Sequence, residues 1–116
     1  MRPDWLDGVT RLHYGWETCV PGHSFGPTVR NHLLYHFAFR GEGKFQTGGD
    51  VFSVHSVDLF LIHPDEITTY TASMEDPWAY AWLGLRVRDL PVHLNVPVIR
   101  QAPVRELFWR LQKIEA

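Results

Sequence analysis

Short hydrophobic segments, alternating or continuous and separated by glycine- and proline-containing turns, run through most of this chain. Alternation with a period of two is typical of a strand with one buried face, whereas a short continuous run is typical of a strand covered on both faces. The run from Leu59 to His63 is of the second kind. The pattern predicts strands at residues 9–19, 31–40, 44–47, 51–55, 59–63, 68–72 and 78–87, and it allows a weaker one at 92–99, where two prolines intervene.

Turn-forming residues separate these segments and fix the fold class. Residues 21–27 are rich in proline and glycine and are predicted to form a loop, and tight turns are predicted at 41–43, 48–50 and 64–66. Many short strands joined by such turns favour an all-β sandwich or barrel. We therefore expect a small antiparallel β-barrel over residues 1–102.

Only the end of the chain has a helical pattern. Pro103 suits the first position of a helix, and the hydrophobic residues that follow it have helical spacing: Val104, Leu107, Phe108, Leu111 and Ile114. We expect one C-terminal α-helix over residues 103–116. A helix of about a dozen residues is marginal alone, so it should pack on the β body or on a partner.

Composition narrows the function classes. The 116 residues suffice for one domain, and a net charge of -2 gives no strong field that would attract nucleic acid. The single Cys19 excludes an internal disulfide and a cysteine-based metal cluster. No signal-peptide pattern opens the chain and no segment has the length of a membrane span, so we expect a cytoplasmic domain that has no membrane partner.

The segment that carries most information is residues 76–82, in which Trp78, Tyr80 and Trp82 occupy alternate positions after a turn-forming Asp-Pro. Alternate residues of a strand point to one face, so these three rings should line up. Such a wall can stack on a small flat ligand or a sugar and hydrogen-bond it through the phenol. The alternative is that the same rings are simply core.

The order and spacing of several motifs make the sequence recognisable. They are Gly26-Pro27, residues 32–39, Gly41-Glu42-Gly43, residues 59–64, Tyr70-Thr71-Ala72 and residues 76–82. Over residues 8–86 the chain resembles the N-terminal ligand-binding and dimerisation domain of AraC-family bacterial transcription regulators, a cupin-like jelly roll. It departs from the family at Leu85-Arg86-Val87, where Phe-x-Gly is usual.

The resemblance implies a function. It implies that a small-molecule effector, a carbohydrate, binds inside the barrel, with aromatic contacts from Tyr70 and Trp82 and a polar contact from Tyr80. It also implies a homodimer, whose helices would begin at residues 103–116, and DNA binding through a C-terminal helix-turn-helix domain that lies outside this chain.

Two further residues are candidates for the ligand site. Arg30 could give bidentate hydrogen bonds to a sugar or a carboxylate, or it could be a solvated charge at a strand entry. His36 shares a strand face with His32. If Leu33, Tyr35 and Phe37 fill the barrel, both histidines face outward or toward a second sheet, and in the reverse register both point into the cavity.

Seven histidines invite a metal hypothesis, because enzymatic cupins bind a metal through His and Glu. Aligned on the turns, the positions that would supply these ligands hold Thr68, Leu33 or Leu34, and residues 28–31, which contain no His pair. We therefore expect no metal, no cofactor and no catalytic residue. The competing hypotheses are a metal-dependent cupin isomerase or dioxygenase, and a dimerisation module that binds no ligand.

Overall fold

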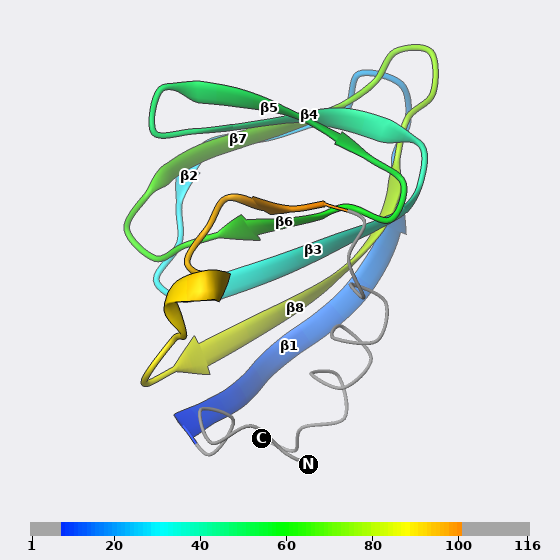
Figure 1. The fold of residues 1–116 in the computed structure, drawn as a ribbon. Helices are drawn as coiled ribbons and strands as arrows, with labels where there is room; N and C mark the ends of the chain where they lie inside the picture. The colour runs from blue at the N-terminus through cyan, green and yellow to red at the C-terminus, as the bar shows by residue number, and fades with distance from the viewer. Residues whose placement is uncertain (1–7, 101–116) are drawn as a thin grey trace.

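Two antiparallel β-sheets lie face to face in the computed structural model, which describes residues 8–100 (Figure 1). The five-stranded sheet has the order β1 (Val9–Thr18), β8 (Ala79–Val87), β3 (Leu33–Arg40), β6 (Leu59–Ile62), β9 (Val98–Ile99). The four-stranded sheet has the order β2 (Ser24–Val29), β7 (Ile67–Ala72), β4 (Glu42–Thr47), β5 (Asp50–His55). A short 3₁₀ helix, η2 (Val92–Leu94), precedes β9. The all-β jelly-roll prediction is confirmed, and the helix predicted at 103–116 lies outside the described residues.

Two local predictions were wrong. The loop predicted at 21–27 contains the first four residues of β2, and the weak strand predicted at 92–99 is η2 followed by only two residues of β9. β2 tolerates Gly26 and Pro27 because it is the end strand of its sheet and its register shifts between Phe25 and Thr28. Proline is admitted at such edges and bulges, where its missing N–H leaves no ladder bond unmade.

The turns predicted at 48–50 and 64–66 are present, whereas the turn predicted at 41–43 is reduced to a bend at Gly41, because Glu42 and Gly43 already belong to β4. Gly48 and Gly49 join β4 to β5 with φ of 59° and 83°, and Asp65 turns the chain before β7 with φ of 68°. Positive φ is the region that glycine adopts without penalty and that aspartate tolerates better than most residues. The local sequence therefore specifies where the chain reverses, within the β4–β5 hairpin and in the connection from β6 to β7.

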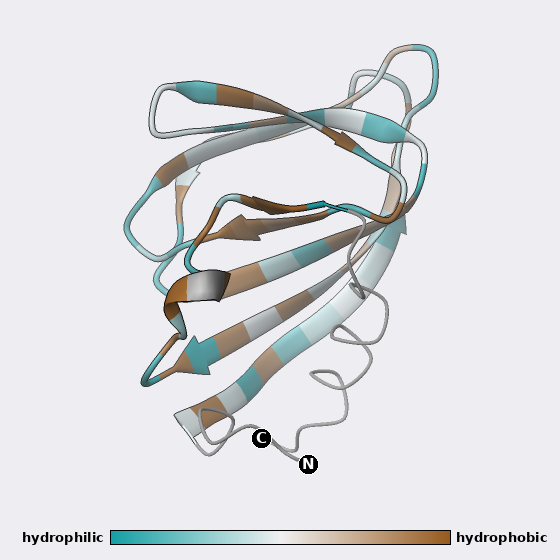
Figure 2. Ribbon diagram, in the orientation of Figure 1, coloured by the Kyte–Doolittle hydropathy of each residue, from teal (hydrophilic) through white to brown (hydrophobic). Residues whose placement is uncertain are grey.

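The central strands of the five-stranded sheet, β8, β3 and β6, have buried residues on both faces. One face points away from the other sheet, and its buried residues form what we call the outer cluster: Val9, Leu33, Tyr35, Phe37, Leu59, Leu61, Leu83 and Leu85. Leu90 and Ile99 pack against it. Figure 2 shows that β6 is hydrophobic from end to end, as its burial on both sides requires, whereas hydrophobic and polar residues mix along β1.

The second face points toward the four-stranded sheet and contributes to the inner cluster. Its buried members are Cys19, Leu34, Ala38, Phe45, Val54, Phe60, Ile62, Tyr70, Ala72, Trp78 and Tyr80. The register decides the question that the sequence left open, because Leu34, His36 and Ala38 face the opposite sheet while Tyr35 and Phe37 lie in the outer cluster. His36 therefore points into the sandwich.

One buried carboxylate ties the end of the described chain to the sheets. Asp58, in the turn before β6, accepts hydrogen bonds from the His55 backbone N–H at 3.0 Å and from Arg100 at 2.8 Å. A buried carboxylate is tolerated only when it is paired in this way.

Across residues 8–100, no helix is long and apolar enough to span a membrane.

Candidate functional site

The five residues predicted to bind a ligand lie near one another, on four different strands or strand ends. His36 comes from β3, Tyr80 and Trp82 from β8, Tyr70 from β7, and Arg30 from the residue after β2. His36 lies opposite Trp82 in the β3–β8 register, which places both on the inner face. These positions are far apart in the sequence, and only the stacking of the two sheets brings them together.

The aromatic rings form a continuous network of contacts. The His36 ring centroid lies 5.0 Å from that of Tyr70 and 5.1 Å from that of Tyr80, and Tyr80 lies 6.1 Å from Trp82. These separations and tilted orientations are those that aromatic pairs prefer. Trp78, Tyr80 and Trp82 all belong to the inner cluster, as their alternation predicts, but Trp78 is wholly buried core and only Trp82 is partly accessible.

His36 is the most unusual polar group of this region. Its side chain is 3 % exposed, stacks on Phe60 at 4.5 Å with the rings nearly parallel, and has no hydrogen-bond partner for Nδ1. Burial lowers the pKa of His36 to about 3, and the charges of Arg30 and His13 act in the same direction. The imidazole is therefore neutral at physiological pH. An unmade hydrogen bond on a buried nitrogen is costly, and a ligand hydroxyl could satisfy it.

Arg30 supplies positive charge at this site. Its Nε–H is buried without a hydrogen-bond partner, although the residue as a whole is only half-buried. Its charge lowers the pKa of His36, and it opposes the rise that burial causes in the pKa of Tyr70. Arg30 is therefore not a purely solvated strand-entry charge. A guanidinium with an unsatisfied N–H can donate to a hydroxyl or a carboxylate oxygen of a ligand.

Glu17, which sequence reasoning did not place at the site, adjoins Tyr80. Glu17 on β1 lies opposite Tyr80 in the register and accepts a hydrogen bond from its hydroxyl at 3.2 Å. Burial raises the pKa of Tyr80, and the neighbouring charges of Tyr70, Cys19 and Glu17 add to that rise. Tyr80 is thus a neutral phenol whose proton points to a carboxylate. The pairing of β1 with β8 was the missing information.

Trp82 occupies a space made by a neighbouring glycine. A Cβ added to Gly15, which lies opposite Trp82 on β1, would come within 2.4 Å of the indole Cζ2. The indole N–H donates to His13 Nδ1 at 3.2 Å. Gly15 lies within residues 8–86, over which the chain resembles the family, yet its contact with the indole appears only in three dimensions.

The structure also shows what stands at the positions a cupin metal would need. Thr68 is buried with an unpartnered hydroxyl, and Leu33 and Leu34 are buried among hydrophobic side chains. Across residues 8–100 no three His, Cys, Asp or Glu side chains are grouped so that they could hold a metal ion. The donor set that a transition metal prefers is not assembled by these residues.

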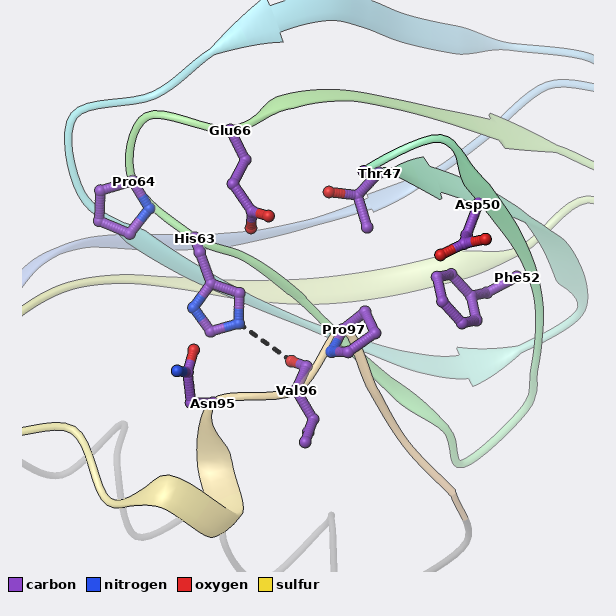
Figure 3. Close-up of a pocket in the computed structure, with 10 residues that line it drawn as sticks. Thr47, Asp50, Phe52, His63, Pro64, Glu66, Asn95, Val96 and Pro97 are labelled. Atoms are coloured by element: carbon purple, nitrogen blue, oxygen red, sulfur yellow. Dashed lines mark hydrogen bonds between the residues drawn. The ribbon is translucent and has the colours of Figure 1, made fainter.

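A separate cavity of about 350 Å³ lies elsewhere in the molecule (Figure 3). Glu66, Thr47 and Asp50 project toward it from different segments, and His63 donates to the Val96 carbonyl at 3.0 Å at its border. It lies beside β5 and β9, the last strands of the two sheets, whereas the five predicted residues lie on and near β8, β3, β7 and β2. None of those five lines this cavity. The five predicted residues are the better candidates for the ligand site, because their unpartnered nitrogens and aromatic rings converge.

The fold and the inner face together define a class of protein: a small jelly-roll domain with an aromatic and polar interior. Among solved structures it is similar to a Cupin 2 conserved barrel domain protein from Salinispora arenicola, with a TM-score of 0.56 and 15 % identity over 66 % of this chain and 72 % of that one. The likeness shows the fold alone.

The family is shown by sequence. The model of the AraC-like ligand binding domain matches residues 12–111, so the chain belongs to that family. The chain is 40 % identical over 72 residues to the Msm operon regulatory protein of Streptococcus mutans, covering 62 % of this chain and 26 % of that protein. It is 28 % identical over 81 residues to the lactose operon transcription activator of Staphylococcus xylosus, covering 70 % and 29 %. The match therefore spans under a third of the length of either regulator.

Proposed function

We propose that this domain is the effector sensor of a bacterial transcription regulator and binds a small carbohydrate beside Trp82. The observation that carries the proposal is the convergence of one accessible indole with three nearly buried polar rings, His36, Tyr70 and Tyr80. A sugar ring has an apolar C–H face that stacks on indole, and its hydroxyls need donors and acceptors. The names of the two relatives, an operon regulator and a lactose operon activator, support the same class of ligand.

Each polar group has a role that its chemistry allows. The neutral His36 Nδ1 and the Arg30 Nε–H are buried groups without partners, so a ligand that satisfied them would recover hydrogen bonds that the free domain lacks. Glu17, already bonded to the Tyr80 hydroxyl, is a further acceptor for ligand hydroxyls. This combination of stacking and directional hydrogen bonding selects a polyhydroxylated ring over a purely hydrophobic ligand.

The sensor role requires that binding change something outside the pocket. A ligand controls a regulator only if it favours one of two arrangements of that regulator. We propose that the domain works in the cytoplasm as a homodimer through the helix predicted at residues 103–116, and that it passes ligand occupancy to a DNA-binding domain beyond this chain. Analytical ultracentrifugation of the chain with and without residues 103–116 tests the dimer, and a monomer in both cases would contradict it.

Calorimetric titration of the 116-residue chain against a panel of mono- and disaccharides tests the ligand class. We expect binding of at least one sugar. We expect Trp82→Ala to weaken that binding about tenfold, because an aromatic stacking contact contributes about 0.5–1.5 kcal/mol beyond the burial of its surface. Trp16→Ala is the matched control, because Trp16 lies on the neighbouring strand and is 66 % exposed. Absence of binding to every sugar at millimolar concentration would contradict the proposal, as would equal losses in the two variants.

We further propose that the domain is not an enzyme, because both curated relatives are named as regulators. The competing hypothesis is a metal-dependent cupin enzyme. Elemental analysis of the purified chain separates the two, since a stoichiometric transition metal that survives dialysis would favour the enzyme. A domain that dimerises yet binds no small molecule would instead support the dimerisation-module hypothesis.

A further inference from the structure

A directed chain of hydrogen bonds leads away from Trp82 toward the start of β3. The Trp82 indole Nε1–H donates to His13 Nδ1 at 3.2 Å. His13 Nε2 lies 2.8 Å from His32 Nε2, and His32 Nδ1 lies 2.8 Å from Asn31 Oδ1. Four side chains from β8, β1 and the segment before β3 are thereby linked in a row.

The chemistry of these groups fixes where each proton lies. Indole nitrogen can only donate, so His13 Nδ1 must accept and His13 carries its proton on Nε2. That proton points at His32 Nε2, which must accept in turn, so the His32 proton lies on Nδ1 and points at the Asn31 carbonyl oxygen. All three bonds are satisfied by one pair of neutral tautomers. A proton added to either imidazole would place two N–H groups against each other.

Packing supports the same arrangement. A Cβ added to Gly84 would come within 2.2 Å of His13 Nε2, just as one added to Gly15 would collide with the Trp82 ring. Two glycines on paired strands therefore leave room for two flat rings to lie across them. The His13 and His32 rings meet edge to face with centroids 4.9 Å apart.

The surroundings of His32 favour its neutral form. Burial lowers the pKa of His32, and the positive charges of Arg30 and Arg86 add to that effect. Arg30 is itself one of the candidate ligand-binding groups, so the chain and the ligand site share an electrostatic environment. A bound ligand would meet an indole whose orientation is already set by its hydrogen bond to His13.

We propose that His13 and His32 are positioning residues that hold the Trp82 indole in the plane on which the ligand stacks. The inference rests on the proposed function for its ligand role, but the hold on the indole is independent of it. Preorganising a contact surface removes the cost of ordering it on binding, so loss of the hold should weaken ligand binding without removing any ligand contact.

The test uses the 116-residue chain with ¹⁵N-labelled tryptophan, in which Trp82→Phe assigns the Trp82 indole signal by its disappearance. His13→Phe keeps a flat ring over Gly84 but removes the acceptor. We expect the indole proton to move upfield and to exchange with solvent about five- to tenfold faster, the change that loss of one ordinary hydrogen bond gives. His32→Phe is a second variant that leaves the His13 contact in place and should give a smaller change of the same sign.

Two further variants separate positioning from a merely structural role. His13→Asn places an amide oxygen near the site of Nδ1 and should restore the indole signal toward its original position. His55→Phe is the matched control, because the His55 side chain is exposed on β5, in the other sheet from Trp82, and lies 3.1 Å from the Glu42 carboxylate. Its indole spectrum and sugar affinity should match those of the unmodified chain.

Each result decides a separate point. A shifted indole with about fivefold weaker sugar binding in His13→Phe, reversed in His13→Asn, supports the inference. An unchanged indole signal overturns it, and so does a shifted indole with unchanged sugar affinity. If no sugar binds even the unmodified chain, the proposed function fails together with the ligand role of Trp82, while the indole signal still shows whether the two histidines hold the ring.

Discussion

The two faces of the five-stranded sheet are built from the same strands yet have different chemistry. The outer cluster consists of aliphatic and aromatic side chains, whereas the inner face includes His36, Tyr80 and Trp82, with Glu17 and His13 beside them on β1. Both faces are buried, so burial alone does not distinguish core from site. What distinguishes them is the kind of buried polar atom without a partner. Among residues 8–100, the inner face of this sheet carries ring nitrogens of His36 and Trp78, whereas the outer cluster carries the Tyr35 hydroxyl. Cores normally satisfy such atoms, and a ligand could satisfy the one on His36.

The contrast also indicates how stability and binding are divided. The outer cluster should supply hydrophobic stabilisation and tolerate no loss of volume, while the inner face should accept substitutions that cost binding more than stability. Four experiments test this division, from the largest expected effect to the smallest.

Leu61→Ala should cost about 2–5 kcal/mol of unfolding free energy, because Leu61 is fully buried in the outer cluster and its truncation leaves a cavity. Denaturant titration measures the effect. Leu12→Ala, at a residue that is 37 % exposed, is the control and should change stability far less. Sugar affinity, measured well below the denaturation midpoint, should be unchanged, and a large loss of affinity would argue against the separation of the two faces.

The fall in unfolding free energy below pH 6.5 should reflect the titration of His36. Its pKa is about 6.5 when unfolded and about 3 when folded, so the unfolded chain binds a proton first as pH falls. The stabilisation from the neutral, buried imidazole is complete above pH 6.5 and decreases toward pH 3, by about 2 kcal/mol at pH 5.

His36→Phe removes this titration and should flatten the pH dependence of unfolding free energy between pH 6.5 and 5. Comparison of the two chains by denaturant titration at several pH values measures it. The exposed His55 gives the control, since His55→Phe should leave the slope in place. A His36→Phe profile as steep as that of the unmodified chain would show that His36 is not the buried neutral group described above.

Gly15→Ala should disturb the ligand site more than the fold. Its Cβ would stand 2.4 Å from the Trp82 ring, so the partly exposed indole must move, at a cost of about 1–3 kcal/mol in stability or in binding. Double-variant analysis with Trp82→Leu checks the mechanism, because removal of the ring should remove most of the penalty of the alanine. Additive effects in that cycle would contradict the contact.

Tyr80→Phe should have the smallest effect, about 0.5–1.5 kcal/mol, because it removes one hydrogen bond to Glu17 and keeps the ring. If ligand hydroxyls use the same pair, calorimetry should show a similar loss of sugar affinity. Glu17→Gln keeps an acceptor and is the matched variant, with a smaller expected loss. A loss of stability in Tyr80→Phe without any loss of sugar affinity would place the Tyr80–Glu17 pair in the core rather than in the ligand site.

Most strands could be predicted from the sequence because their signals are local. Alternation, the continuous run before Pro64 and the Gly48-Gly49 reversal each depend on neighbouring residues, and the structure places strands and turns there. The failures were also physical. Gly26 and Pro27 signalled a loop, but an end strand with a register shift can include them, and the segment at 92–99 formed a 3₁₀ turn and a two-residue strand instead of a longer one.

The sequence by itself determined that this chain is an all-β sandwich or barrel, because hydrophobic period and turn chemistry are local properties. Its resemblance to a known family added the jelly-roll topology. The sequence also placed Trp78, Tyr80 and Trp82 on one side of a strand. Only the tertiary structure decided that His36 points inward and that Glu17 and His13 meet Tyr80 and Trp82. These facts depend on which strands pair and in which register, and pairing between residues more than forty positions apart leaves no mark on the sequence near either one.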